Sequence, residues 1–492
     1  MVAECFARRR RRFLDAMQDG VAIFPSWPVQ RRNADQDQAY RPDSDLYFLT
    51  GFGEQESAAV LIKEGKQSRY ILFVRPRDPE MEQWVGHRAG VEGAVRDFGA
   101  DESYPIEELD ARLPGLLENR GTLYHEFGRH EAHDVRILRA IEDLKAGVRN
   151  GKFGPWTLID PRTILWPMRR TKDAGDIADL QRAADVTAAG FRAAMRAIVP
   201  GMGEGELAAV LEFEFKRRGA QRVGFETICA AGAHATVLHY ITNDGVIGPD
   251  DLVLLDAGAE VDMVSADITR TFPASGRFTP IQRRVYEWVL KAQAAAIAAV
   301  KPGATYDQVH RAALEVLVDG LIDLKVVKGT RDEVIATGTY RPYFMHRIGH
   351  WLGSDVHDVG AYHVDGNSIK LEPGMVITIE PGLYFNDAPP TPKALRGIGI
   401  RIEDDVVVVK GGRRVLTGDV PKGVDEIEAF MAQPGSWWAW LHPVTVAGDE
   451  AALAGESPEP PKPAKAPAKA AAKAKAAAPA KPARGKAARA KA

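Results

Sequence analysis

Four carboxylates and one imidazole stand at or beside apolar runs in the second half of this sequence. They are Asp256, Asp267, His350, Glu380 and Glu403. Oxygen-rich donor sets suit hard divalent cations, and four negative charges are too many for one such ion. Two cations about 3.5 to 4 Å apart would balance the charge and could activate a water molecule for hydrolysis. Mn²⁺ fits these donors best, and Co²⁺, Zn²⁺ or Fe²⁺ stay open.

The first two acids are predicted to face each other across a β-hairpin. An apolar run ends in Asp256, and a turn region separates it from a second strand near Asp267. A turn centred on Val261 and Asp262 would set Asp256 opposite Asp267, with Cβ atoms about 4.5 to 5.5 Å apart. Two bare carboxylates repel at that distance, and a divalent cation between them removes the repulsion. The pair alone does not establish a site, because either acid could face solvent.

A cluster of histidines strengthens the metal hypothesis. His346, His350 and His357 lie within thirteen residues, together with Asp355 and Asp358. Histidine accounts for only 12 of 492 residues, so this clustering is unexpected by chance. Neutral imidazoles bind metals or exchange protons near pH 7, whereas a core histidine normally occurs singly.

The last two acids are placed by strand patterns. Glu380 closes an apolar run and precedes Pro381, so its carboxylate is expected where a strand leaves its sheet. Arg401 and Glu403 are two residues apart and are predicted to share one strand face, with the intervening isoleucine on the other. An acid alternating with isoleucines indicates a polar site that faces inward.

The elements that must position these residues fall into two units. Residues 1–165 alternate strand-like runs with polar helical stretches, which is typical of an α/β domain. The pattern breaks near Trp166 and Pro167, and an Ala-rich helix then begins near Thr171. The predicted domains are residues 1–168, an α/β N-terminal domain; residues 169–433, the catalytic domain; and residues 434–492, a linker and tail.

The second unit is predicted to be α+β, because its helices and strands do not alternate strictly. The expected helices span residues 204–218, 280–300 and 306–321. The expected strands span residues 252–257, 375–380 and 400–409.

The C-terminal tail has a net positive charge, whereas the rest of the chain is net negative. Residues 461–492 contain eight lysines and two arginines without an acid, so a net charge of −3 leaves −13 for the remainder. A Pro, Ala and Lys sequence cannot form a core and is expected to be disordered. It is either a solubilising tail or a segment that contacts polyanions in a salt-sensitive way.

Cysteine content and the absence of long apolar runs predict the cellular location. Only Cys5 and Cys229 occur, and their spacing indicates neither a disulfide framework nor a thiolate metal site. No apolar run approaches the ~18 residues of a membrane span, and the N-terminus lacks the apolar segment of a secretory signal. We therefore expect a cytoplasmic protein without a membrane segment.

Together these segments resemble the aminopeptidase P and prolidase family of pita-bread metallopeptidases. The resemblance covers roughly residues 5–432, and it implies a pita-bread catalytic domain preceded by a smaller α/β domain. The motifs that carry it are Asp43-Ser-Asp-Leu-Tyr-Phe-Leu-Thr-Gly-Phe, Leu255-Asp256-Ala-Gly, Asp267-Ile-Thr-Arg-Thr-Phe, His350-Trp-Leu-Gly-Ser-Asp-Val-His-Asp-Val-Gly, Glu380-Pro-Gly-Leu-Tyr and Gly399-Ile-Arg-Ile-Glu-Asp.

The resemblance also implies how the ligands are shared. Asp256 would chelate one cation, Asp267 and Glu403 would bridge both, and His350 with Glu380 would complete the second. Glu380 would also shuttle a proton from the attacking water to the leaving nitrogen.

Further residues match substrate-binding positions of the family. His239 matches a substrate-binding histidine, and His357 matches one that contacts the scissile carbonyl. His346 would line a proline pocket, while Arg401 and Tyr384 would orient the metal ligands. His234 matches no family role and is interpreted as a loop residue.

An oligomer is implied as well. Trp84 resembles a tryptophan that a neighbouring subunit inserts at the mouth of the active site, so a homodimer or homotetramer is expected.

The implied reaction releases the N-terminal residue from peptides with proline in second position. An Xaa-Pro bond lacks an N–H and has a fixed φ, which calls for a dedicated pocket. The alternative is an Xaa-Pro dipeptidase, which shares every ligand. A non-enzymatic pita-bread binding protein is a further alternative, against which the intact ligand set argues.

Overall fold

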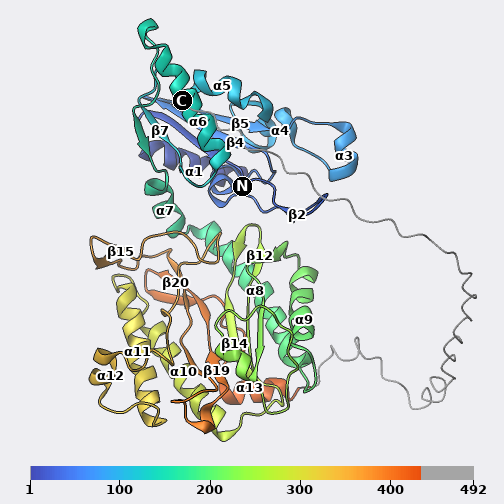
Figure 1. Cartoon of the computed structure of the whole chain (residues 1–492), viewed down its shortest axis with the longest axis vertical. Coiled ribbons are helices and arrows are strands. Elements are labelled where there is room, and N and C mark those ends of the chain that lie inside the picture. The colour runs from blue at the N-terminus through green and yellow to red at the C-terminus, as the bar shows by residue number, and fades with distance from the viewer. Residues whose placement is uncertain (1, 434–492) are drawn as a thin grey trace, which may run out of the picture. The chain divides into compact units, whose positions relative to one another are not determined.

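The N-terminal domain is built on a six-stranded mixed sheet (Figure 1). The computed structural model describes residues 2–433, so the tail predicted to be disordered lies outside the described residues. The strand order is β6-β5-β4-β1-β7-β8, with an antiparallel centre and parallel outer pairs. These strands are β1 (Gly20–Pro25), β4 (Ala58–Glu64), β5 (Gln67–Val74), β6 (Glu102–Pro105), β7 (Thr122–Tyr124) and β8 (Thr157–Ile159).

Both faces of this sheet are buried. Val21 and Ile23 belong to the core on one face, and Ala22 and Phe24 belong to the core on the other. Alternate side chains of a strand point to opposite faces, which explains why the whole of β1 is apolar. The covering helices include α1 (Val2–Ala16), α2 (Ser44–Thr50), α4 (Gly90–Phe98), α5 (Leu109–Leu117) and α6 (Glu131–Ala146).

Two further elements of this domain matter below. Helix α3 (Pro79–Val85) has no buried residue. Helix α7 (Arg162–Arg170) leads into the second domain and spans the predicted boundary at residue 168. A small hairpin of β2 (Arg31–Asn33) and β3 (Gln36–Asp37) completes the domain.

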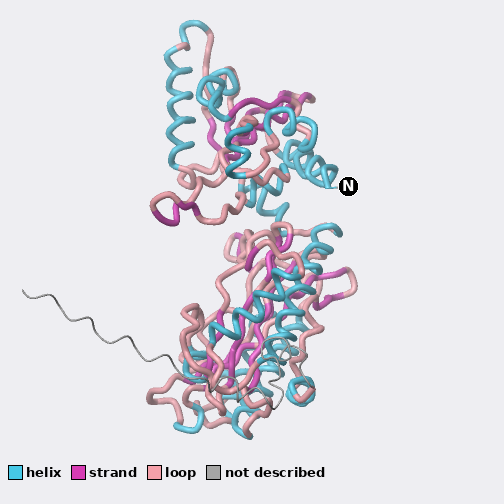
Figure 2. Tube along the Cα trace, turned by 90° about the vertical axis from the view of Figure 1, so that its right-hand side faces the viewer, coloured by secondary structure: helices cyan, strands magenta, loops and turns pink. Residues whose placement is uncertain are grey.

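The second domain packs around its own hydrophobic core and is α+β, as predicted. Helix α8 packs on α9 and α10 packs on α11, and Figure 2 shows the strands running between helices. The helices are α8 (Ala174–Ala197), α9 (Glu204–Arg217), α10 (Pro280–Ala299), α11 (Tyr306–Asp323), α12 (Arg331–Thr337) and α13 (Val424–Met431).

Several small sheets carry the chemistry-bearing residues. Their orders are β10-β11-β14, β17-β20-β21, β18-β19, β13-β12-β9 and β15-β16. The strands are β9 (Arg222–Val223), β10 (Ile228–Ala231), β11 (Leu252–Ala257), β12 (Ala259–Val261), β13 (Val264–Ser265), β14 (Ile268–Pro273), β15 (His363–Val364), β16 (Asn367–Ser368), β17 (Val376–Ile379), β18 (Gly382–Phe385), β19 (Ile398–Arg401), β20 (Asp404–Val409) and β21 (Gly412–Val415).

The predicted hairpin exists, but its predicted register is wrong. Asp256 is paired with Thr269 rather than with Asp267. The turn lies one residue later, on Asp262 and Met263, whose φ angles are 49° and 66°. Positive φ at both central residues is typical of the two-residue turns that match strand twist. Because side chains alternate with a period of two, this two-residue shift in pairing keeps Asp267 on the same face as Asp256.

The single strand predicted over residues 400–409 is also wrong. The structure has two strands there, β19 and β20, which belong to different sheets. The chain breaks at Ile402 and Glu403, where the N–H of Ile402 donates to the carbonyl of Pro381 and that of Glu403 to the carbonyl of Thr269. Glu403 therefore follows the end of β19 instead of sharing a strand with Arg401.

Across residues 2–433, every helix is too short or too polar to traverse a lipid bilayer.

Candidate active site

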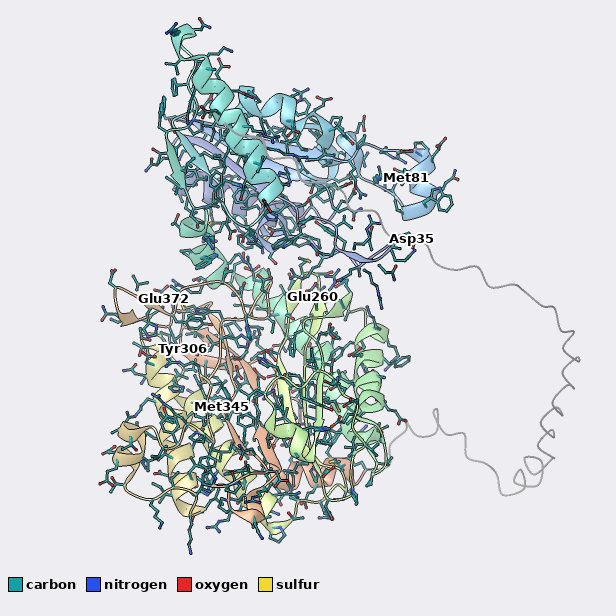
Figure 3. The ribbon with its side chains drawn as sticks, viewed as in Figure 1. Asp35, Met81, Glu260, Tyr306, Met345 and Glu372 are labelled. Atoms are coloured by element: carbon teal, nitrogen blue, oxygen red, sulfur yellow. The ribbon has the colours of Figure 1, made fainter. Side chains whose placement is uncertain are left out.

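A cavity of about 480 Å³ in the second domain gathers the residues that the sequence singled out. All five predicted ligands line it, together with His239, His346, His357 and Arg401. Met345, the neighbour of His346, is labelled within this domain in Figure 3. Tyr384 lies behind the cavity wall, where it is buried.

Strand ends position the ligands. Asp256 lies near the end of β11, and Asp267 directly precedes β14 in the same hairpin. Glu380 directly follows β17, whose four residues are all buried, and Pro381 takes the chain out of that strand. Glu403 directly precedes β20, which pairs with β17. The carboxylates thus emerge from neighbouring apolar strands into one space.

His350 lies at the centre of the candidate metal site. Suitable ligand atoms of Asp267, His350 and Glu403 all lie within 4.8 Å of one another. His350 Nε2 is 3.3 Å from Asp267 Oδ2 and 3.6 Å from Glu380 Oε1. Its Nδ1 is 3.0 Å from the carbonyl oxygen of Trp351, and a proton donated there leaves Nε2 free to act as a ligand.

The buried acids lack enough positive charge of their own. Burial raises the pKa of Asp267 well above its ordinary value, and the charges of Asp256, Asp405 and Glu380 raise it further. Burial and the charge of Asp267 raise the pKa of Glu403 in the same way. Neighbouring divalent cations would reverse this unfavourable balance.

Unpartnered oxygens show where cations fit. Within the described residues, Asp256 Oδ1, Asp267 Oδ1 and Glu403 Oε1 are buried without a hydrogen-bond partner. Buried carboxylate oxygens normally accept hydrogen bonds or bind metals. The residues present therefore fit a group of hard divalent ions.

Arg401 and Thr269 hold the second oxygens of these acids. Arg401 Nη2 donates to Asp256 Oδ2 at 2.6 Å, and its Nε donates to Thr269 Oγ1 at 3.1 Å. Thr269 Oγ1 in turn donates to Glu403 Oε2 at 2.6 Å. Sequence reasoning missed Thr269, although its place two residues after Asp267 predicts the same strand face.

The histidines that match substrate-binding positions surround this cluster. His346 Nε2 lies 3.0 Å from Tyr384 Oη, which also accepts a hydrogen bond of 3.1 Å from Arg401 Nη1. The ring centroid of His357 lies 4.1 Å from that of His350. Burial lowers the pKa values of His346 and His357, so both favour the neutral form.

Other residues of the cavity wall carried no signal in the sequence. They are mostly apolar and complete a surface on which a peptide could lie. These residues are Phe225, Glu226, Ile228, Leu238, Ile241, Arg347, Gly349 and Val356.

Trp84 is not brought to the cavity within this chain. It belongs to α3 of the N-terminal domain and is 85% exposed. Met81 on the same helix is also exposed (Figure 3).

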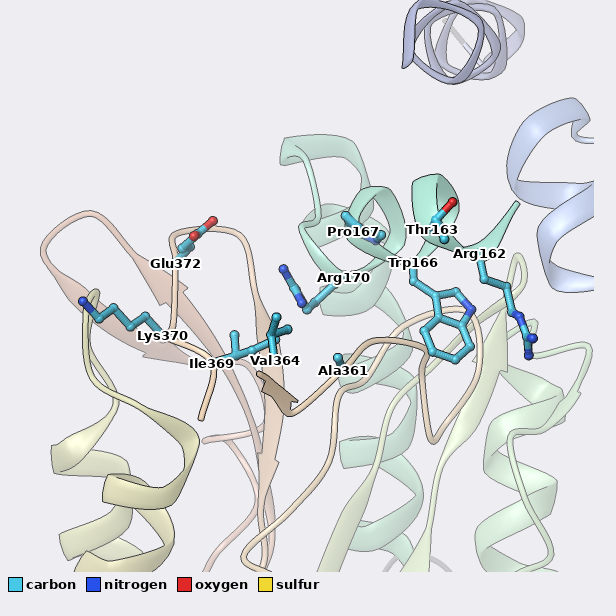
Figure 4. A pocket seen from close by; sticks show the side chains of 10 residues that line it. All are labelled: Arg162, Thr163, Trp166, Pro167, Arg170, Ala361, Val364, Ile369, Lys370 and Glu372. Carbon is cyan, nitrogen blue, oxygen red and sulfur yellow. The ribbon is translucent and has the colours of Figure 1, made fainter. Parts of the chain in front are cut away.

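A second cavity, of about 410 Å³, has a different character (Figure 4). Helix α7 contributes Arg162, Trp166 and Arg170, and the segment around β15 and β16 contributes Lys370 and Glu372. A single carboxylate among three cations cannot form the acid-rich site described above. This second cavity is therefore not a second copy of the candidate active site.

An α+β fold with a buried carboxylate and histidine cluster in a peptide-sized cavity defines a metallohydrolase class of protein. Comparison with known proteins narrows this class. Residues 178–410 match the model of metallopeptidase family M24, and residues 6–124 match that of the aminopeptidase P N-terminal domain.

Relatives cover nearly the whole described chain. The Xaa-Pro aminopeptidase of Escherichia coli K12 is 41% identical over 428 residues, which are 87% of this chain and 97% of that protein. The structure of the Pseudomonas aeruginosa aminopeptidase PepP matches with a TM-score of 0.86 and 44% identity, covering 87% of this chain and 98% of that one. E. coli aminopeptidase P in complex with substrate matches with a TM-score of 0.85 and 40% identity over the same shares. The chain belongs to the M24 metallopeptidases, as an aminopeptidase P with its characteristic N-terminal domain.

Proposed function

We propose that this chain is a dinuclear metal-dependent Xaa-Pro aminopeptidase, which hydrolyses the bond between an N-terminal residue and a proline in second position. The main support for this proposal is the set of buried, unpartnered oxygens on Asp256, Asp267 and Glu403 beside His350. The similar Xaa-Pro aminopeptidases, which align over almost their full length, support the choice of substrate.

The proposed ligands divide between two cations. Asp256 would hold one ion, His350 and Glu380 would hold the other, and Asp267 and Glu403 would contribute to both. Bound there, divalent cations would supply Lewis-acid polarisation and activation of water. Mn²⁺ is the proposed metal, because four of the five ligands are hard oxygen donors. One similar structure is of a zinc-substituted E. coli enzyme, and Zn²⁺ stays an outcome of the test.

Proton transfer falls to Glu380. Its Oε1 accepts a 3.3 Å hydrogen bond from Thr378 Oγ1, which fixes the carboxylate at the cavity wall. Glu380 accepts the proton of the attacking water and donates it to the leaving proline nitrogen, so the carboxylate is regenerated in each cycle.

Three histidines hold the substrate in this proposal. His357 contacts the scissile carbonyl, and His239, on the loop between β10 and β11, binds the peptide. His346, braced by Tyr384 and Arg401, lines the proline pocket.

Metal content and peptide length test the function together. Purified protein loaded with Mn²⁺ is incubated with Xaa-Pro dipeptides and Xaa-Pro-Pro tripeptides, and released residues are quantified. We expect about two metal ions per chain and cleavage of the tripeptides. Cleavage of dipeptides alone would assign the chain as a dipeptidase. Protein that binds no metal and cleaves neither would support the non-enzymatic alternative.

A homodimer or homotetramer is proposed from Trp84. A tryptophan with 85% of its surface exposed on a helix without buried residues is a typical interface anchor. Light scattering should give two or four times the chain mass of 53.7 kDa, and Trp84→Ala should weaken the assembly. A monomer at micromolar concentration would contradict this proposal.

The tail and the location are proposed on composition alone. Deletion of residues 458–492 should lower salt-sensitive retention on a polyanion column if the ten basic residues there contact polyanions. Unchanged retention would favour the solubilising role.

A cytoplasmic location is consistent with Cys5 and Cys229, which are both free thiols, and fractionation of cells would test it.

A further inference from the structure

The segment that carries His239 has little regular structure of its own. It connects β10 to β11, begins with the 3₁₀ turn Gly232–Thr236 and then runs as a loop past His239. Val237 and Ile241, on either side of His239, are 53% and 55% exposed. Leu238 and Tyr240, the immediate neighbours of His239, pack against a small buried cluster, so apolar contacts hold the middle of the loop and polar contacts must hold its ends.

A single carboxylate outside the cavity fastens both ends of this loop. Glu204, the first residue of α9, is 0% exposed. Its Oε1 accepts hydrogen bonds from the N–H of Ala231 at 2.7 Å and from His234 Nδ1 at 2.9 Å. Its Oε2 accepts from Tyr240 Oη at 2.9 Å and from the N–H of Gly245 at 2.7 Å. Two donors precede His239 in the chain and two follow it.

This arrangement uses the whole acceptor capacity of a carboxylate, which is about four hydrogen bonds. Hydrogen bonds to a charged acceptor are roughly twice as strong as neutral ones. The close approach of the loop to Glu204 requires glycine at position 245, because a Cβ there would lie only 2.7 Å from Glu204 Oε2. The N–H of Glu204 also donates to the carbonyl of Gly245, so the contact is reciprocal.

His234 and Tyr240 join the two sides of the loop. Their rings stack with centroids 4.4 Å apart, and both contact Glu204. Tyr240 Oη also lies 2.7 Å from Asp244, so its single proton is shared between the two carboxylates. His234, which matched no family role, thus helps to hold the loop that carries His239.

We infer that Glu204 is a positioning residue, which sets His239 over the cavity by holding both ends of its loop. This inference rests on the proposed function and on the role of His239 in it. Glu204 is absent from the cavity wall and reaches the substrate only through the loop.

A double-mutant cycle tests the inference. Glu204→Gln keeps the size of the side chain but turns one acceptor oxygen into a donor that faces N–H or O–H groups. It should lower kcat/KM for an Xaa-Pro-Pro tripeptide about ten- to hundredfold, the usual cost of losing an orienting partner of a site residue. In a His239→Ala background the same substitution should cost less than about twofold, because its effect passes through His239.

Equal losses in both backgrounds would overturn the inference, as would unchanged kinetics of Glu204→Gln. A normal metal content is expected, since Glu204 contacts none of the proposed ligands in the described structure. If Glu204→Gln does not fold, Tyr240→Phe replaces it in the cycle, removes one of the four bonds and should show a smaller loss with the same non-additivity.

Glu214→Gln is the matched control. Glu214 lies near the other end of the same helix and is also buried, but it binds Arg217 and Arg218 instead of the loop of His239. Its substitution should leave kcat/KM unchanged. An unsubstituted protein without activity would contradict the proposed function, whereas an active one with additive losses would contradict only the role of Glu204.

Discussion

Two clusters of buried acids in this protein are balanced in opposite ways. At the junction of the two domains, Arg169 donates to Asp45 at 2.7 Å, to Asp355 at 2.7 Å and to Asp358 at 2.6 Å. Lys172 Nζ adds a 2.8 Å bond to Asp358. The acids of this junction are thus paired with cations that the chain itself supplies.

The acids of the cavity are not paired in this way. Asp256 binds Arg401, but Asp267 and Glu403 depend on neutral donors and on His350. Burial raises the pKa values of Asp267 and Glu403. At the junction, by contrast, the charge of Arg169 lowers the pKa of Asp355 although burial would raise it. The same residue types therefore build a charge-balanced contact between the domains in one place and a candidate cation site in the other, and the supply of positive charge makes the difference.

The two clusters share one segment of chain. Asp355 and Asp358 of the junction flank His357, which lines the cavity. Arg41 Nε of the N-terminal domain also donates to Glu260 of the second domain, labelled in Figure 3, at 2.7 Å. Ser44 of the N-terminal domain donates to Asp355 Oδ1 at 2.6 Å, so this domain also holds the segment that presents His357.

The largest effect is expected from loss of a shared ligand. Asp267→Asn removes one charge between the proposed cations, and kcat/KM should fall about 10³- to 10⁴-fold, since metal catalysis contributes several kcal/mol. Kinetics with defined Mn²⁺ and metal analysis of the purified variant would measure this loss.

The stability of the same variant separates the two clusters. In a chelator, Asp267→Asn protein should be at least as stable in urea as the unsubstituted protein, because an unbalanced acid has been neutralised. A clear loss of stability in chelator would mean that Asp267 is structurally paired, like the junction acids.

A large loss of stability is expected at the junction. Arg169→Met leaves the buried Asp45 and Asp358 and the partly exposed Asp355 without their common partner, and the free energy of unfolding should fall by about 3 to 5 kcal/mol. Urea titration with and without metal would measure it. If bound metal restored the lost stability, the junction acids would not be balanced by the cations of the chain alone.

Much of this contrast could be predicted from the sequence. The apolar runs that end in Asp256 and Glu380, and the clustered histidines, placed the ligands at strand ends around one site. The junction could not be predicted, because Asp45, Arg169 and Asp355 are far apart in the chain and none lies in a periodic pattern. The hairpin register failed for a related reason, since only the positive φ angles of Asp262 and Met263 fix the turn.

A moderate effect is expected from the neutral donor in the cavity. Thr269→Val keeps the shape but removes the O–H that Glu403 accepts and the oxygen that Arg401 contacts. Metal affinity, measured by competition with a chelator, should fall about ten- to hundredfold. Ser at this position restores the hydroxyl, so Thr269→Ser should recover most of the affinity, and failure to do so would assign the loss to packing.

The smallest effect is a change in acid sensitivity. Because Arg169 holds the pKa of Asp355 below its ordinary value, the unfolded chain binds this proton more readily than the folded one. The stabilisation from Asp355 is therefore fully present above the unfolded pKa of about 3.9 and is lost as the pH falls through the folded pKa. Asp355→Asn should remove that contribution and flatten stability below about pH 4, by at most about 1.4 kcal/mol per pH unit for one proton. Urea titrations of both proteins between about pH 3 and pH 6 would measure the slopes, and equal slopes would show that Arg169 is balanced by Asp45 and Asp358 alone.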